Sequence, residues 1–170
     1  KKKEIGYVFA NAQTKGRGTH GKKWISKEGN LFGSFFFPLK NNYPLFNEFA
    51  VINAVLLSEV IKRICKNKTI SIKWPNDILV NGKKICGILQ EIITFSSKKF
   101  LIVGIGLNIV SNPNIAAKHK ATNILLESNN NISIQEIMNL IINSYEKFFN
   151  DLKKYKYIDF KKRADLLLKI

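Results

Sequence analysis

Four short apolar runs follow one another between residues 70 and 110, separated by turn signals. They cover residues 70–73, 78–80, 84–94 and 100–110. Asn81-Gly82, between the second and third runs, is a strong signal for a two-residue hairpin turn, and residues 96–99 form another polar turn. Strands joined by turns this short pair with their sequence neighbours in antiparallel order. This part of the chain therefore predicts an antiparallel meander.

The remaining periodic segments complete the expected fold. Two further strands are expected over residues 5–10 and 31–39, because both runs are rich in apolar and aromatic residues. Expected helices cover residues 44–65, a segment that begins at a Ser133/Glu136 capping box, and residues 154–170. We predict an α+β fold with a mixed, largely antiparallel sheet packed by helices, as one domain over residues 1–170.

The charge of the chain bears on its partners. The formal net charge is +16, but only 3 of the 28 basic residues are Arg. A surface dedicated to nucleic acid would use more Arg, whose planar guanidinium binds phosphates and bases bidentately. The surplus is instead typical of a composition rich in Lys, Asn and Ile, and it should attract ATP and acidic proteins. A basic nucleic-acid-binding protein is kept as an alternative.

Several other signals are lacking in the sequence. No apolar run reaches the roughly 18 residues of a membrane span, and residues 1–4 lack the apolar stretch of a signal peptide. Cys65 and Cys86 have no metal-binding spacing, and His20 and His119 lie far apart. We therefore expect a cytoplasmic protein with reduced thiols and no DNA or membrane partner. Cys86 is expected to be a core residue, with a catalytic thiol as the alternative.

The first candidate binding segment is a glycine-rich loop over residues 13–24. It carries Gly16, Gly18 and Gly21 among basic residues, and such a loop lets several backbone N–H groups point at one anion. It matches neither the Walker pattern nor the dinucleotide fingerprint. A solvated basic loop is the alternative.

Three further segments carry polar groups or glycines in or beside strands. Lys73-Trp74-Pro75-Asn76-Asp77 offers a cation, an amide and a carboxylate at a rigid corner, which suits a nucleotide and Mg²⁺, although a simple β-turn is the alternative. The others are Gly82-Lys83-Lys84-Ile85-Cys86-Gly87-Ile88-Leu89-Gln90-Glu91 and Gly104-Ile105-Gly106-Leu107-Asn108. Glycines within strands often mark the close approach of a ligand, with a bulge or tight packing as the alternative.

Together the four segments resemble the biotin protein ligases, also called biotin–[acetyl-CoA-carboxylase] ligases. The family patterns are a GRGRxGxxW-like loop, KWPND, K-x-x-G-I-L-x-E and G-x-G-x-N, and all four occur here in that order within residues 5–150. The resemblance implies a catalytic domain of the class II aminoacyl-tRNA synthetase/biotin ligase type. It also implies that biotin and ATP, with Mg²⁺, form biotinyl-5′-AMP, from which biotin passes to a lysine of a biotin carboxyl carrier protein.

The resemblance also implies roles for individual residues. Gln13, with the backbone around Gly16, Arg17 and Gly18, would bind the ureido end of biotin, and Gly104 and Gly106 would lie under its bicyclic ring. Arg17 and Lys84, with Gly87 nearby, would bind the biotin carboxylate and the phosphate joined to it. Trp24 would lie against adenine. The residues implied for ATP are Asn76, Asp77 and Asn108, with Asp77 and Asn108 as Mg²⁺ ligands. The implied catalytic set is Arg17, Lys73, Lys84 and Asp77.

The sequence also departs from the family pattern. Thr19 stands where the family usually has Arg, so we expect the adenylate to be held less tightly. We expect no Ser-Thr-Asn segment before the first strand, no SH3-like C-terminal domain and no N-terminal DNA-binding domain. A homodimer through a sheet edge is expected by analogy. A lipoate or octanoate ligase or transferase of the same fold, and a catalytically inactive relative, are kept as alternatives.

Overall fold

The computed structural model describes residues 4–113, 120–128 and 132–168, and within them the chain forms one six-stranded sheet. The strands are β1 (Gly6–Ala10), β2 (Leu31–Pro38), β3 (Ile70–Lys73), β4 (Asp77–Val80), β5 (Lys83–Phe95) and β6 (Lys98–Leu107). Their order in the sheet is β1-β2-β6-β5-β4-β3, and neighbouring strands pair antiparallel. Parallel pairing occurs within these ranges only as isolated bridges, Ile72 with Leu168 and Lys84 with Ala121. The prediction of an α+β fold with a largely antiparallel sheet is confirmed.

The predicted meander corresponds to β3, β4, β5 and β6, and its turns explain its register. Asn81 and Gly82 have φ angles of 50° and 76°, the left-handed conformations that a tight hairpin turn requires. Ser96 and Ser97 also have positive φ, 47° and 62°, and they alone form the second turn. The expected turn over residues 96–99 was therefore too long, because the next two lysines already belong to β6.

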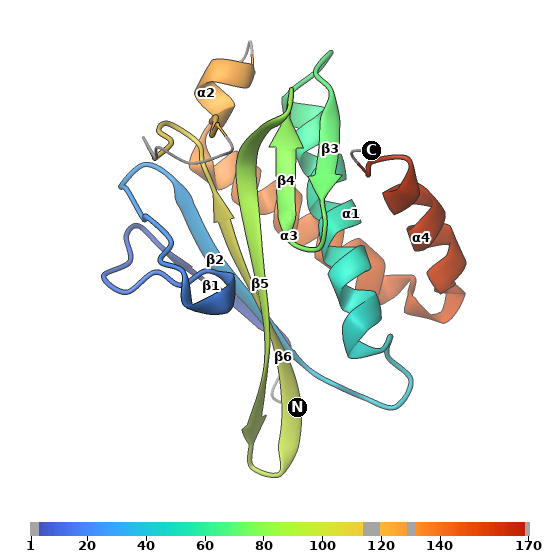
Figure 1. Ribbon diagram of the computed structural model, residues 1–170. Helices are drawn as coiled ribbons and strands as arrows, with labels where there is room; N and C mark the ends of the chain where they lie inside the picture. The colour runs from blue at the N-terminus through green and yellow to red at the C-terminus, as the bar shows by residue number, and fades with distance from the viewer. Residues whose placement is uncertain (1–3, 114–119, 129–131, 169–170) are drawn as a thin grey trace.

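Helices α1 (Phe46–Ile64) and α3 (Ile134–Asn150) cover one face of the sheet, and α4 (Tyr157–Asp165) packs against α1 beside β3. The loop before β2 lies on the other face (Figure 1). A fourth, short helix is α2 (Ile124–Glu127). The capping box predicted at the start of α3 is confirmed. Among the described residues, no helix is long and apolar enough to cross a membrane.

The final helix is shorter than predicted, because the chain first makes a turn. The 3-10 helix η2 (Leu152–Lys154) follows α3, and the backbone N–H of Tyr155 donates to the carbonyl of Leu152. This turn redirects the chain before α4 starts at Tyr157. Residues 169–170 of the expected helix, and His119, lie outside the described ranges.

The hydrophobic core lies between the helices and the sheet. Alternate residues of β6 are buried on this side: Leu101, Val103, Ile105 and Leu107. Phe35 of β2 stacks on Tyr145 of α3 with ring centroids 4.5 Å apart. The residues of β6 that alternate with these four buried ones, including Gly104 and Gly106, therefore face away from the helices. This open face carries the pocket described next.

Candidate functional site

A pocket of about 490 Å³ lies under the loop formed by residues 13–25. Its floor comes from β5 and β6, and the corner between β3 and β4 forms one side. All the predicted site residues line it except Gly16: Gln13, Arg17, Gly18, Trp24, Lys73, Asn76, Asp77, Lys84, Gly87, Gly104, Gly106 and Asn108. Four segments far apart in sequence thus meet in one cavity, of a size typical for small-molecule sites.

Gly16 shapes the loop instead of lining the cavity. A Cβ atom there would lie 2.5 Å from the backbone oxygen of Trp24 and 2.7 Å from Oγ of Ser26. The backbone N–H of Trp24 donates to the Gly16 carbonyl at 3.0 Å, and Gly18 N–H donates to the Lys22 carbonyl at 2.7 Å. The two sides of the loop are therefore held together closely, and any side chain at residue 16 would force them apart.

Trp24 rests directly on the sheet, on two of the predicted glycines. Added Cβ atoms would come within 2.6 Å of its indole at Gly87 and within 2.4 Å at Gly106. At Gly104 the nearest contact would be an ordinary 3.4 Å, to the carbonyl of Leu89. The two glycines of β6 therefore differ: Gly106 makes room for the indole, whereas Gly104 leaves open floor. The indole N–H is buried and has no hydrogen-bond partner among the described residues.

Lys84 reaches the pocket because β5 contains a bulge. The pairing of β4 with β5 shifts between Ile78 and Leu79, so that Ile78 lies opposite Cys86 and Leu79 opposite Lys84. Ile85 is the extra residue, and it is fully buried. Without the bulge, strict alternation would place Lys84 and Gly87 on opposite faces of the sheet. With it, both line the pocket.

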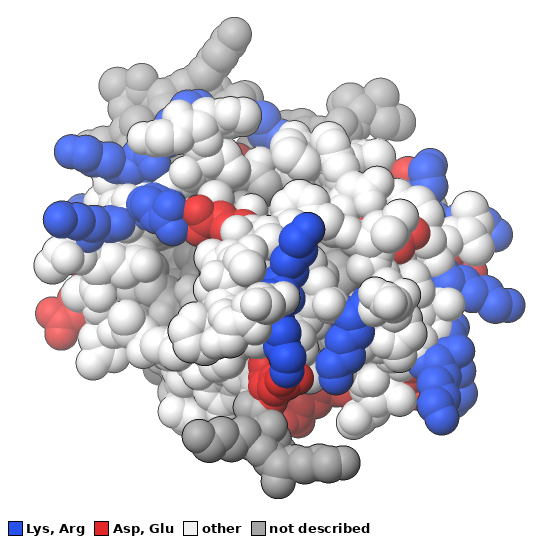
Figure 2. Space-filling view, turned by 90° about the horizontal axis from the view of Figure 1, so that it is seen from below, with Lys and Arg blue, Asp and Glu red and all other residues white. Residues whose placement is uncertain are grey.

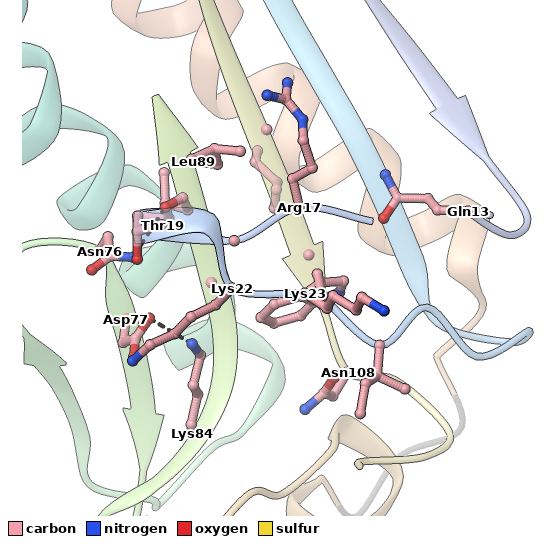
Figure 3. Close-up of a pocket in the computed structure, with 18 of the residues that line it drawn as sticks. Gln13, Arg17, Thr19, Lys22, Lys23, Asn76, Asp77, Lys84, Leu89 and Asn108 are labelled. Atoms are coloured by element: carbon pink, nitrogen blue, oxygen red, sulfur yellow. Dashed lines mark hydrogen bonds and ion pairs between the residues drawn. The ribbon is translucent and has the colours of Figure 1, made fainter. Parts of the chain in front are cut away.

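The side chain of Lys84 is held by two neighbours. Its Nζ lies 2.7 Å from Oδ1 of Asp77 and 5.1 Å from the centre of a Trp24 ring. The ion pair is only partly exposed, 30% for Lys84 and 18% for Asp77, so water screens it less than a surface pair. The result is a cation with a defined position in the pocket, shown by the dashed line in Figure 3.

Arg17 points away from that ion pair (Figure 3). Its Nη1 and Nη2 donate to the two carboxylate oxygens of Glu91 at 2.9 and 2.7 Å. The predicted cations therefore occupy two separate positions, Lys84 beside Asp77 and Arg17 beside Glu91. Lys73, the third of them, lies exposed at the end of β3.

Asn76 and Asn108 have structural bonds of their own. The amide of Asn76 donates to the carbonyl of Ile88 at 3.3 Å and to Oγ1 of Thr19 at 3.5 Å, which ties the loop to the corner. Asn108 is buried, and its amide nitrogen donates to the carbonyl of Thr122 at 3.0 Å. Both side chains are thus fixed in orientation, with their Oδ1 atoms left as the groups that can accept.

The described part of the chain contains no group of three or more His, Cys, Asp or Glu side chains that could hold a metal ion. Asp77 is one pocket carboxylate, paired with Lys84, and Glu91 is the other, paired with Arg17. A fixed amide and one carboxylate suit Mg²⁺ only if a ligand supplies further oxygens, which is how nucleotide phosphates commonly bring this ion.

Cys86 is a core residue, as expected. It is 1% exposed, and burial raises the pKa of its thiol to about 12. The thiol is therefore protonated at neutral pH and is not a nucleophile.

Several pocket residues were not singled out from the sequence. Leu89 and Glu91 belong to the K-x-x-G-I-L-x-E pattern but were given no role, and Ile102 was not considered. All three lie on the open face with Gly87 and Gly104, and the alternation of a strand could have indicated them. Ala121 had no such signal, because it reaches the pocket through its bridge to Lys84 from a segment remote in sequence.

The basic residues of the pocket are part of a wider distribution. Lys15, Lys22 and Lys23 also line the pocket. On the face shown in Figure 2, Lys and Arg side chains occupy several separate places among larger uncharged areas. This view shows no single basic surface of the kind that a nucleic-acid-binding protein would present.

Comparisons with known proteins identify the family of the chain. The family model described as "Biotin/lipoate A/B protein ligase family" matches residues 1–108. The chloroplastic biotin–protein ligase 1 of Arabidopsis thaliana is 34% identical over 146 residues, covering 81% of this chain and 39% of the relative. The bifunctional ligase/repressor BirA of Bacillus subtilis is 32% identical over 161 residues, covering 91% of this chain and 49% of the relative. The chain thus spans less than half the length of these two relatives.

A solved structure gives the same result for the fold. The biotin protein ligase of Aquifex aeolicus in complex with biotin and ATP superposes with a TM-score of 0.80 at 28% identity, covering 95% of this chain and 68% of that one. The family match extends from the start of the chain through the glycine-rich loop, the 73–77 corner and both glycine-bearing strands to Asn108. The chain belongs to the biotin/lipoate A/B protein ligase family.

Proposed function

We propose that this chain is the catalytic part of an ATP-dependent biotin–[acetyl-CoA-carboxylase] ligase. It would form biotinyl-5′-AMP and transfer biotin to a lysine of a biotin carboxyl carrier protein. One observation carries the proposal: the loop, the corner and both glycine-bearing strands line a single pocket. The relatives named above are biotin–protein ligases or a ligase/repressor, and the structural neighbour was solved with biotin and ATP.

In the first step, a carboxylate oxygen of biotin attacks the α-phosphorus of ATP, and pyrophosphate leaves. Two anions must approach each other, so the main barrier is electrostatic, and a fixed cation lowers it. Lys84 meets this need, because Asp77 and the Trp24 ring hold its ammonium group in one place. No side-chain nucleophile is required, in agreement with the protonated Cys86 thiol.

Trp24 and the two asparagines fit the nucleotide. The indole presents a flat apolar surface against which adenine could stack. The side-chain oxygens of Asn76 and Asn108 are held in fixed directions by the bonds that their amide nitrogens make. An adenosine group that donates a hydrogen bond could pair with one of these oxygens.

Gln13 fits the ureido end of biotin. Its Oε1 accepts a hydrogen bond from Oγ of Ser26 at 2.7 Å, so its Nε2 is the group left to donate. A ureido oxygen is an acceptor, and Gly104 offers open floor in the same pocket. Biotin would then lie with its carboxylate directed towards Lys84.

Mg²⁺ would enter with ATP. Asp77 and Asn108 are the residues that would contact it, and the ion would neutralise phosphate charge when bound. The protein would supply the Asp77 carboxylate and the Asn108 amide oxygen to such an ion, and further oxygens would have to come from the nucleotide and water.

In the second step, a neutral amine of the acceptor lysine attacks the biotinyl carbon, an amide forms and AMP leaves. The incoming lysine carries a proton at neutral pH and must lose it before it reacts. Asp77 is the pocket carboxylate nearest to Lys84, and we propose that it favours this proton loss. A homodimer stays a prediction, to be checked by sedimentation.

Biotin-dependent exchange of pyrophosphate into ATP tests the proposal. We expect the protein to catalyse exchange with biotin and not with lipoate or octanoate. Exchange with lipoate or octanoate and not with biotin would assign the chain to the other branch of its family. Absence of exchange with all three acids would contradict adenylate formation by this chain.

A further inference from the structure

The ion pair between Arg17 and Glu91 lies at the edge of the pocket, where the glycine-rich loop meets the sheet. Glu91 belongs to β5 and lies opposite Ile102 of β6 in the register, on the open face. The two carboxylate oxygens accept from both terminal nitrogens of Arg17, at 2.9 and 2.7 Å. Such a paired geometry fixes the guanidinium in direction as well as in position.

Arg17 is linked to Trp24 through the backbone of the loop. Arg17 forms a bridge with Lys23, and the N–H of Trp24 donates to the carbonyl of Gly16 at 3.0 Å. The Trp24 indole in turn lies on Gly87 and Gly106. A displacement of Arg17 from Glu91 therefore shifts the strand of the loop that carries Trp24.

The described contacts between this loop and the sheet are few. Besides the Arg17–Glu91 pair, they include the 3.5 Å bond from Asn76 to Thr19, the packing of Trp24 on Gly87 and Gly106, and the approach of Lys84 to the Trp24 ring. The bond to Thr19 is at the limit of hydrogen-bond length, so it holds the loop weakly. The ion pair also borders a second hollow, of about 410 Å³, which is lined by residues 17–22, Leu89 and Glu91. The ion pair therefore lies between the main pocket and this second hollow, because both of its residues line each of them.

We propose that Glu91 is a positioning residue that holds the glycine-rich loop over the pocket through Arg17. Glu91 thereby slows the dissociation of biotinyl-adenylate from the pocket; this part of the proposal rests on the proposed function. Glu91 touches no reacting atom in this account, because its two oxygens are both occupied by Arg17. It acts on the site only through the loop.

The exposure of the pair sets the size of the effect. The side chains are 69% and 34% exposed, so the pair contributes little to the stability of the fold. Replacement of Glu91 by Gln should therefore leave the melting temperature nearly unchanged. Loss of the ion pair should affect loop opening more than unfolding, because the loop has few other contacts with the sheet. The loop should therefore open about twofold to fivefold more often in this variant.

Backbone hydrogen exchange of Gly18 and Trp24 measures loop opening without any ligand, because both N–H groups are bonded within the loop. In Glu91→Gln both should exchange about twofold to fivefold faster, while core amides of β6 keep their rates. Glu59→Gln is the matched control, because Glu59 pairs with Arg163 on the helical side in a similar way. It should leave both loop amides unchanged.

A charge swap, Arg17→Glu with Glu91→Arg, provides the second variant. It should restore exchange at Gly18 and Trp24 to near the original rates, although Arg17 itself is lost. Unchanged loop exchange in Glu91→Gln overturns the proposal, as does failure of the swap to restore it in a folded protein.

Release of preloaded biotinyl-adenylate measures the consequence for the ligand. Glu91→Gln should release it about twofold to fivefold faster. Slower release would mean that Glu91 competes with the ligand for Arg17, and unchanged release would mean that the loop does not retain it. Either result overturns the proposal. If the adenylate does not bind at all, the proposed function fails, and the exchange data alone decide the role of Glu91.

Discussion

The helix-covered face of the sheet and its open face are built from alternate residues of the same strands. On the covered face, β6 presents Leu101, Val103, Ile105 and Leu107, all at most 3% exposed. On the open face the same strand presents Ile102, Gly104 and Gly106, which line a pocket. One face is filled by apolar side chains, whereas on the other face two glycines of β6 leave room for a pocket.

The difference separates stability from binding within single strands. Apolar area removed from water stabilises the covered face. The open face instead holds groups that are costly to leave without a ligand, such as the buried N–H of Trp24, and charges that are held in pairs. Substitution of a covered-face residue should therefore lower stability, whereas substitution of its neighbour on the open face should lower ligand binding.

The largest expected effect is on the covered face. Leu101 is fully buried, so Leu101→Ala should lower the free energy of unfolding by about 2–5 kcal/mol. The folded fraction should still bind biotin and ATP normally. Ile102→Ala, one residue along, should reduce ligand affinity with a much smaller loss of stability. Urea denaturation measures the free energy of unfolding, and calorimetric titration measures the ligand affinity. Equal stability losses in both variants would contradict the division of the two faces between stability and binding.

Substitution of Lys84, on the open face, should lower activity and leave stability nearly unchanged. Lys84→Met removes the fixed cation of the pocket and should slow adenylate formation about 100-fold, as for the loss of one oxyanion-stabilising group. The fold should remain, since the side chain is partly exposed. Lys83→Met is the matched control, because Lys83 makes only a distant contact, 3.9 Å, to Glu127. Similar losses of activity in the two variants would argue against a special position for Lys84.

The two glycines of β6 should differ from each other. Gly106→Ala would bring a Cβ within 2.4 Å of the Trp24 indole, so the ring must move and nucleotide affinity should fall about tenfold, the loss of one stacked contact. Gly104→Ala makes only an ordinary contact and should leave Trp24 in place. Quenching of Trp24 fluorescence in a Trp74→Phe background reports the ring position. A ring that stays fixed in Gly106→Ala would contradict the packing described here.

Thr19→Arg should slow release of biotinyl-adenylate up to about tenfold, because a guanidinium adds a charge-assisted hydrogen bond to the phosphate. Thr19 lies at the start of η1 (Thr19–Gly21) and faces Asn76 across the pocket edge. A release rate equal to that of the unaltered protein would show that residue 19 does not affect ligand retention.

The smallest effect concerns pH and the covered face. The hydroxyl and backbone N–H of Ser133 donate to Glu136, which lowers the pKa of that carboxyl below its ordinary 4.5. A lowered pKa in the folded state stabilises α3 at higher pH, and this contribution is lost as pH falls below about 4.5. Glu136→Gln should therefore show a weaker loss of stability between pH 6 and 3 than the unaltered protein, measured by urea denaturation at each pH.

The strands and most of the helices could be predicted from the sequence because local signals specify them. Alternating apolar residues, the Asn81-Gly82 turn and the Ser133/Glu136 capping box each act within a few residues. The start of α4 could not, because a turn stabilised by η2 has no distinct composition.

The site was predicted from motifs, and its geometry needed the structure. The bulge at Ile85, which brings Lys84 to the pocket, depends on how β4 pairs with β5 and has no local signal. The same holds for the pairing of Arg17 with Glu91, 74 residues apart. The resemblance also treated Gly104 and Gly106 alike, whereas their roles differ once the position of Trp24 is known.

The most direct test of the central claim is a crystal structure of the protein with biotinyl-5′-AMP. The account predicts the ligand on the open face, between the loop of residues 13–24 and strands β5 and β6. Its bicyclic ring should lie over Gly104, its adenine against Trp24 and its phosphate beside Lys84. An adenylate bound elsewhere, or in this pocket without contact to Lys84 and Trp24, would contradict the account.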